Sequence, residues 1–95
     1  MQIQHTTDGK NGSFFVGEKE KPVAEMTYRM RDAGTMIIEH TEVSDELRGK
    51  NIGYQLVETA VEYARASNIK IIPLCPFANS VFKKKPELHD VLSTQ

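Results

Sequence analysis

A short loop carries the residues with the clearest chemical potential in this chain. Charged residues and two glycines gather there between a β-branched segment and a long segment with one apolar face, in the order Arg48, Gly49, Lys50, Asn51, Ile52 and Gly53. Backbone N–H groups at a helix start have no intrahelical partner, and the helix dipole adds partial positive charge. Glycine lets a ligand approach the main chain closely, and the two cationic side chains add full charge. The pattern predicts a site for a phosphate or a similar anion.

A plain helix start is the alternative interpretation of the same loop. Asn51 is of a residue type that commonly caps helices, and the two glycines can relieve backbone strain without binding anything. Short glycine-containing phosphate patterns also arise often by chance. The flanking segments must therefore support the anion-binding interpretation.

The segment after the loop is predicted to be an amphipathic helix over residues 52–68. It contains no proline and no glycine beyond Gly53, and its apolar residues recur every three or four positions, at Leu56, Val57, Ala60, Val61 and Ala64. A short β-branched strand over residues 69–74 follows. Two strands joined by a helix favour a parallel pair, which places the loop at the C-terminal end of the first strand.

The first half of the chain is predicted to be an antiparallel meander. Turn-forming residues at 9–12, 18–22 and 32–34 separate strand-like segments, the last of which, 35–43, leads into the loop. The fold class is therefore α/β, in the α+β sense: a mixed, mostly antiparallel sheet with one main helix and a short C-terminal helix over 78–84, which Pro86 terminates. Residues 1–95 are expected to form a single domain with one modest core that includes Phe14, Phe15 and Phe77.

Composition narrows the possible partners. A net charge of −1 argues against broad nucleic-acid binding. The single cysteine excludes an internal disulfide and a multi-cysteine zinc site, so we expect no metal and a reducing compartment. The N-terminus lacks a secretory pattern and no apolar run approaches about 20 residues, so we expect a cytoplasmic protein with no membrane partner, as a monomer or weak dimer.

The only basic run, residues 83–85, has two interpretations. It is a solvated helix end, or it contacts a ligand phosphate such as the 3′-phosphate of coenzyme A.

The loop in this setting resembles the acyl-CoA pyrophosphate loop of the GCN5-related N-acetyltransferases (GNAT), written Q/R-x-x-G-x-G/A. Arg48 and Gly53 match the ends of that motif, and Asn51 stands at its usual middle glycine. Asparagine accepts left-handed backbone angles better than most residues, so the departure is tolerable. His40-Thr41 and the segment Pro-Leu-Cys-Pro-Phe-Ala at 73–78 resemble the short YjdJ-type subfamily. The resemblance covers nearly the whole chain and implies acetyl-CoA as the acyl donor and an unidentified amine as the acceptor.

Further site residues follow from the resemblance. It implies main-chain oxyanion donors near Glu42 and Val43, a contact from Asn79 to the pantetheine arm, and a position for Cys75 near the acyl group. Tyr54, in the first turn of the main helix, would cover the cofactor or simply pack, and Phe77 would edge the acyl pocket or belong to the core.

Both candidate catalytic residues, Cys75 and His40, have simpler alternatives. Cys75 would accept the acetyl group or protonate the departing thiolate, or it is a small buried core residue. His40 would take a proton from the amine, or it is a structural histidine bonded to the neighbouring loop.

The expected function is acetyl transfer from acetyl-CoA to a small or openly bound amine. Members of the family usually carry one or two helices between their first two strands, where only a tight turn fits here. A non-catalytic acyl-CoA-binding or sensing module that works with a partner is therefore the main alternative. A small interaction domain whose loop binds no nucleotide is a third.

Overall fold

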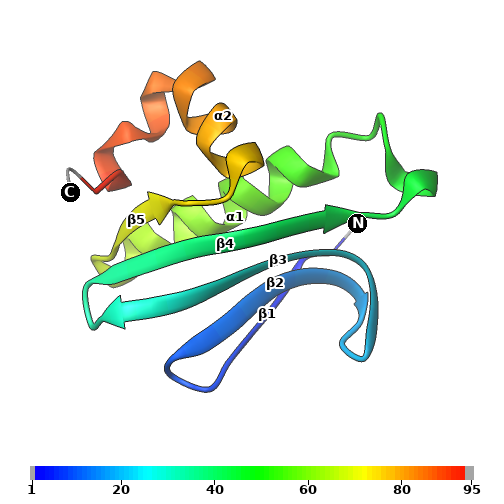
Figure 1. Ribbon diagram of the computed structural model, residues 1–95, viewed down its shortest axis with the longest axis horizontal. Helices are drawn as coiled ribbons and strands as arrows, with labels where there is room; N and C mark the ends of the chain where they lie inside the picture. The colour runs from blue at the N-terminus through cyan, green and yellow to red at the C-terminus, as the bar shows by residue number, and fades with distance from the viewer. Residues whose placement is uncertain (1, 94–95) are drawn as a thin grey trace.

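The computed structural model describes residues 2–93, and its five strands form one sheet in the order β1-β2-β3-β4-β5 (Figure 1). The strands are β1 (Gln4–Thr7), β2 (Asn11–Glu18), β3 (Lys21–Asp32), β4 (Thr35–Val43) and β5 (Lys70–Pro73). Neighbours from β1 to β4 are antiparallel, whereas β4 and β5 are parallel. The predicted mixed, mostly antiparallel sheet is therefore confirmed. The predicted single domain, 1–95, includes Met1, Thr94 and Gln95, which lie outside the described residues.

Two α-helices and two short 3-10 helices complete the described part of the chain. They are η1 (Asp45–Leu47), α1 (Ile52–Ser67), α2 (Pro76–Lys84) and η2 (Pro86–Val91). Helix α2 begins two residues earlier than predicted, because Pro76 takes the first helical position, where its fixed φ and missing N–H are harmless. It ends at Lys84, and Pro86 opens η2. No helix among residues 2–93 is both long and apolar enough to cross a membrane.

The connection between β1 and β2 is a tight turn, as predicted. The Asp8 carboxylate accepts hydrogen bonds from the N–H groups of Lys10 (2.9 Å) and Asn11 (2.8 Å), and Gly9 adopts a φ of +96°. Only residues 8–10 separate the two strands. No helix lies at this point in the chain.

Helix α1 runs along one face of the sheet (Figure 1). Its apolar stripe is fully buried, as the three- and four-residue spacing predicts. It packs against Phe14, Met26, Met36 and Ile38 from three different strands. This packing fixes the start of α1 beside the C-terminal end of β4.

A β-bulge in β4 changes which side chains face the helices. Tyr28 of β3 pairs with Ile38 but Thr27 pairs with His40, so Glu39 is an extra residue in the ladder. Beyond the bulge, Thr41 and Val43 lie opposite Met26 and Ala24, which belong to the core. Because side chains alternate along a strand, the extra residue turns Thr41 and Val43 inward and His40 outward.

Strands β4 and β5 pair only along the first part of β4. Their last paired residues are Ile38 and Pro73, and the N–H of Cys75 donates to the Ile38 carbonyl over 2.9 Å before the chain turns into α2. In the part of the chain that the structure describes, no strand pairs with this edge of β4 from Glu39 to Val43. The sheet is therefore open beside the start of α1.

Candidate functional site

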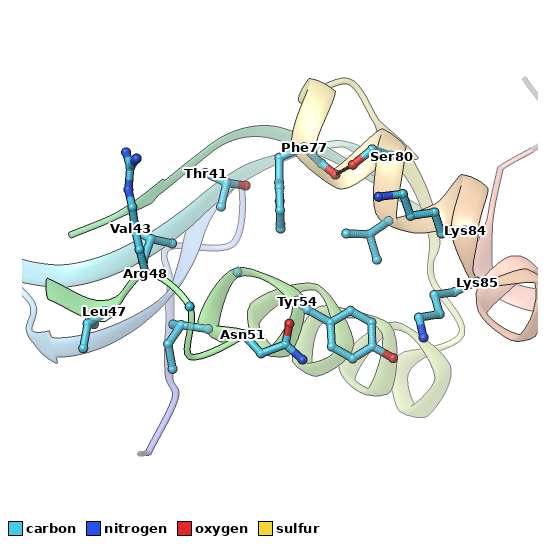
Figure 2. A pocket seen from close by; sticks show the side chains of 14 residues that line it. Thr41, Val43, Leu47, Arg48, Asn51, Tyr54, Phe77, Ser80, Lys84 and Lys85 are labelled. Atoms are coloured by element: carbon cyan, nitrogen blue, oxygen red, sulfur yellow. Dashed lines mark hydrogen bonds between the residues drawn. The ribbon is translucent and has the colours of Figure 1, made fainter. Parts of the chain in front are cut away.

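A cavity of about 650 Å³ lies where β4, the loop, the start of α1 and one side of α2 meet (Figure 2). Its walls combine apolar and basic side chains with main-chain groups of the loop. They are formed by Thr41, Val43, Leu47, Arg48, Gly49, Asn51, Ile52, Gly53, Tyr54, Phe77, Ser80, Val81, Lys84 and Lys85. Most of the loop residues singled out from the sequence therefore lie together on one wall.

The loop leaves main-chain donors free at the start of α1. The first helical bond runs from the N–H of Gln55 to the carbonyl of Asn51 (3.1 Å), so the N–H groups of residues 52–54 have no intrahelical acceptor. Asn51 occupies the capping position, yet its side chain makes no capping hydrogen bond. The Asn51 side chain therefore does not cap α1, and the simple helix-cap interpretation is wrong on this point. The N–H groups of residues 52–54 remain available to a ligand.

Left-handed backbone shapes the loop. Asn51 adopts φ 64° and ψ 24°, and Gly49 adopts a φ of +83°. Asparagine enters this region more readily than most residues, and glycine enters it without strain. Asn51 thus holds the conformation that a glycine would hold at the same place.

The loop's charged side chains lie at the edge of the site. Arg48 is 74% exposed, lies at the rim of the cavity and pairs with Asp45 at 3.0 Å. Lys50 is exposed and does not line the cavity. The main chain therefore supplies most of the donors that face inward, and Arg48 supplies nearby charge.

The open edge of β4 presents the N–H of Val43 rather than that of Glu42. The N–H of the next residue, Ser44, donates to the Val23 carbonyl of β3 over 2.8 Å. N–H groups alternate between the two sides of a strand, so that of Glu42 also points toward β3 and that of Val43 points to the unpaired edge. Val43 also lines the cavity.

Cys75 lies directly behind the cavity wall. It is 4% exposed, packs in the core, and its thiol donates to the Thr41 hydroxyl over 3.4 Å. Burial acts to raise the pKa of this thiol, but the Thr41 hydroxyl and the N–H groups of Ala78 and Phe77 at the start of α2 more than offset it, so the pKa lies below its ordinary value. Cys75 is thus buried and also disposed to ionise.

Two other predicted site residues do not line the cavity. The His40 side chain is 64% exposed on the outer face of β4, 3.9 Å from the Glu42 carboxylate. Asn79 is half-buried and its side-chain amide donates to the Pro73 carbonyl over 3.4 Å. Tyr54, in contrast, does line the cavity. The bulge at Glu39 explains the orientation of His40, and the roles of all three residues stay predictions.

Several lining residues lay outside the sequence-based prediction of the site. Phe77, expected in the core or at the edge of the acyl pocket, is 41% exposed and forms a cavity wall, whereas Phe14 and Phe15 are buried as predicted. The buried residues of α2 are Ala78, Val81 and Phe82, so Phe77 lies at the margin of the apolar face. That spacing is the signal that separates it from the core. The inward orientation of Thr41, by contrast, has no signal in the sequence, because it depends on the bulge.

Comparison with known proteins assigns the family. Residues 13–91 match the model of a family described as GCN5-related N-acetyl-transferase. The solution structure of a GCN5-like protein from Staphylococcus aureus is similar to this chain with a TM-score of 0.78 and 36% identity, over 99% of this chain and 89% of that one. The chain belongs to the GCN5-related N-acetyltransferase family, as its loop and its cysteine-containing segment indicated. The narrower YjdJ-type assignment stays a prediction.

More distant structures share the fold. A GNAT family acetyltransferase from Elizabethkingia anophelis with acetyl-CoA bound has a TM-score of 0.62 and 13% identity, over 90% of this chain and 73% of that one. Glucosamine-6-phosphate N-acetyltransferase from Arabidopsis thaliana has a TM-score of 0.62 and 23% identity, over 93% of this chain and 63% of that one. This chain thus spans less than two thirds of the Arabidopsis enzyme. No curated protein matches it in sequence.

Proposed function

We propose that this protein binds acetyl-CoA and transfers the acetyl group to a small or openly bound amine. The observation that carries the proposal is the cavity that joins free N–H donors at the start of α1 to the unpaired edge of β4. Family membership and the bound acetyl-CoA of the Elizabethkingia structure support it. The expected cytoplasmic location and monomeric or weakly dimeric state stay predictions.

The donor set fits a phosphate-containing thioester. The N–H groups of the loop and of the first turn of α1 would hold the pyrophosphate, with Arg48 at the rim. The apolar walls, such as Val43 and Phe77, would cover the less polar arm of the ligand. When bound, acetyl-CoA supplies an acetyl group activated as a thioester.

The unpaired N–H of Val43 would stabilise the oxyanion during transfer. A donor fixed by the sheet needs no reorganisation when negative charge develops on the carbonyl oxygen, and such donors commonly contribute strongly to acyl transfer. Since the N–H of Glu42 points toward β3, Val43 is the better candidate of the two residues.

The amine would approach from the outer face of β4. A ligand in the cavity occupies the side covered by α1 and α2, which leaves the opposite side of the open edge for the acceptor. His40 and Glu42 are exposed on that outer face, and His40 would take the proton that the amine loses. The turn at residues 8–10 leaves this approach without a covering helix, which favours a small acceptor or one on a partner surface.

Cys75 would act from behind Thr41. A thiol whose pKa is lowered by a neighbouring hydroxyl and by helix-start N–H groups is a better proton donor to a departing thiolate, and a better nucleophile near neutral pH, than an ordinary thiol. We propose that it either protonates the departing coenzyme A thiolate, or attacks the thioester carbonyl as the thiolate. In the second case the bond to the coenzyme A sulfur breaks, coenzyme A leaves as the thiolate, and the amine then takes the acetyl group from Cys75 and releases its thiol.

A non-catalytic acyl-CoA-binding module remains the second candidate. The short β1–β2 connection is the observation that favours it, because no element at that point encloses an acceptor. This candidate shares the cavity and the loop with the enzyme and differs only in turnover.

Calorimetric titration with acetyl-CoA tests the proposal first. The wild-type protein, Arg48→Glu, and Lys50→Glu as a matched control outside the cavity would be titrated at one ionic strength. Saturable binding that is weakened far more in Arg48→Glu than in Lys50→Glu supports the site. Release of coenzyme A only when an amine is added supports the enzyme, and binding without turnover across an amine panel supports the module. No binding by the wild-type protein would reject both.

A further inference from the structure

The cavity carries positive groups at two separate ends. Arg48 and the N–H groups of the α1 start lie at one end, and Lys84 and Lys85 at the C-terminal end of α2 lie at the other (Figure 2). The rings of Phe77 and Tyr54 lie between them. A ligand that spans the cavity thus meets two positive sites separated by aromatic walls.

Lys85 is held in place by an aromatic ring. Its Nζ lies 5.1 Å from the centroid of the Tyr54 ring, and its side chain is half-buried. A cation–π contact of this kind restrains the ammonium group against the cavity wall. Burial first, and then the nearby carboxylates of Glu58 and Glu87, raise the pKa of Tyr54.

Neither ammonium group is already paired with an acid. Across residues 2–93, no salt bridge involves Lys84 or Lys85. The helix dipole favours cations in the last turn of α2, and this alone would account for a basic residue there. It does not explain why two of three consecutive lysines line the cavity while Lys83 does not.

We propose that Lys84 and Lys85 form a second phosphate subsite, which takes the 3′-phosphate of coenzyme A. This inference rests on the proposed function, in which the loop holds the pyrophosphate. Coenzyme A then has one phosphate left, a monoester on the ribose, and such a group carries about −1.5 to −2 charges at neutral pH. Charge-assisted hydrogen bonds from two ammonium groups match it.

The subsite makes the protein selective for coenzyme A over its 3′-dephospho form. The shorter compound keeps the pyrophosphate, the pantetheine arm and the thiol, and so retains every contact to the loop and to β4. It lacks only the 3′-phosphate, which is the group that Lys84 and Lys85 would bind. The two compounds therefore report on the lysine subsite independently of the rest of the cavity.

Titration of both compounds into four proteins tests this inference. The proteins are wild type, Lys84→Gln, Lys85→Gln, and Lys83→Gln as the matched control from the same basic run. We expect wild type and Lys83→Gln to bind coenzyme A about tenfold more tightly than dephospho-coenzyme A, the size of effect typical of hydrogen bonds to charged groups. Each cavity-lining variant is expected to lose most of this preference, while its affinity for dephospho-coenzyme A stays near that of wild type.

The outcomes separate this inference from the proposed function. Equal affinity of wild type for the two compounds overturns the subsite but leaves the proposed function standing. The same holds if Lys83→Gln loses the preference as fully as Lys84→Gln, since the lysines would then act only as general charge at a helix end. If wild type binds neither compound, both are overturned. A Lys84→Arg variant that keeps the preference adds support, because the charge is conserved.

Discussion

Gly53 lies against the ring of Phe77, so closely that a Cβ atom on Gly53 would come within 2.7 Å of the Phe77 Cζ atom. Such a distance is too short for two carbon atoms, and something must move when a side chain is added. The ring is 41% exposed and forms a wall of the cavity. Because Gly53 has no side chain, the Phe77 ring can pack against its backbone, and a ligand can also approach the backbone closely there.

Gly53→Ala is expected to weaken coenzyme A binding about tenfold while the protein stays folded. Alanine is favoured over glycine inside a helix by up to about 1 kcal/mol, and the partly exposed Phe77 ring can swing outward, so stability is largely kept while the wall is lost. Calorimetric affinities and thermal melts of the variant check both effects.

The double variant shows whether the contact is the cause. In a Phe77→Ala background the clash is absent, so adding Gly53→Ala should change affinity little, and the two substitutions should be strongly non-additive. An equal loss from Gly53→Ala in both backgrounds would mean that the ligand itself needs the bare backbone at Gly53.

Asn51 offers a second test, because it replaces a glycine of the family motif and holds a left-handed conformation with φ 64°. Asn51→Gly should keep stability and ligand affinity. Asn51→Ala should lower the free energy of unfolding by about 1 kcal/mol, since a Cβ-bearing residue without a local polar group is strained in this region. Denaturant unfolding of the two variants measures the difference, and an Asn51→Ala variant as stable as Asn51→Gly would contradict the role of backbone angle.

The sequence pattern predicted the elements around this loop well, because strong local signals mark them. Strand 35–43 was predicted with the bounds that β4 has, and the helix predicted over 52–68 ends at Ser67, one residue earlier. Each of these signals acts over a few positions: the apolar period of the helix, the β-branched run after the helix, and the turn at residues 9–12. The parallel pairing of β4 with β5 then follows from connectivity.

The orientation of side chains near the end of β4 was not predictable in the same way. Met36, Ile37 and Ile38 are consecutive apolar residues, so they do not reveal which phase of the alternation faces the core. The bulge at Glu39 then reverses the phase, and nothing local marks it. For this reason the sequence does not predict that Thr41 turns inward and His40 outward. Lys84 and Lys85 lie in the site because α2 packs beside α1. This packing is tertiary structure, and no local sequence pattern predicts it.

Arg65 links α1 to the C-terminal segment and makes the stability of the fold depend on pH in the acidic range. Its guanidinium donates to both carboxylate oxygens of Asp90 (2.9 and 2.8 Å) and to the Glu87 carbonyl (3.0 Å). The Arg65 hydrogen bonds are the largest cause of the lowered pKa of the Asp90 carboxyl. Since the folded pKa lies below the unfolded one, this stabilisation is present above the ordinary value of 3.8 and is lost as pH falls through the folded pKa.

Thermal melts of Asp90→Asn across acidic and neutral pH check this dependence. The variant should melt lower than wild type at neutral pH, and the difference should shrink in acid. Asp8 and Asp32 also have lowered pKa values from backbone hydrogen bonds, so part of the acid sensitivity persists. Glu62→Gln, which touches the same guanidinium but leaves both Asp90 bonds, is the control. A constant difference at every pH would disprove the linkage.

His40 should support acetyl transfer as a proton acceptor if the amine approaches the outer face of β4. His40→Gln should lower the rate of acetyl transfer without changing coenzyme A affinity, because glutamine cannot take the proton that the amine loses. His89→Gln is the control, since His89 bonds the Phe82 carbonyl at 2.6 Å and does not line the cavity. A transfer rate of His40→Gln equal to that of wild type would remove His40 as the base.

Cys75 and Thr41 give the sharpest test of the chemistry behind the cavity wall. Cys75→Ala should lower acetyl transfer at least about tenfold, because it removes a group that either donates a proton or carries the acetyl group. Coenzyme A affinity should stay near that of wild type, since the loop and the walls that would hold the coenzyme are unchanged. Turnover equal to that of wild type would mean that Cys75 is only a core residue. Parallel thermal melts would show whether a loss of transfer comes instead from a loss of folded protein.

Thr41→Val isolates the electrostatic part of that role. Valine fills nearly the same volume but cannot stabilise the thiolate, so the pKa of Cys75 should rise toward its ordinary range, because burial is then opposed only by the backbone N–H groups. The ultraviolet absorbance of the thiolate, followed against pH, measures the shift. If Cys75 acts through its ionisation, the pH dependence of transfer should move in the same direction as the thiol pKa. If the pKa shifts and the rate profile does not, the thiol takes no part in transfer and only packs beside Thr41.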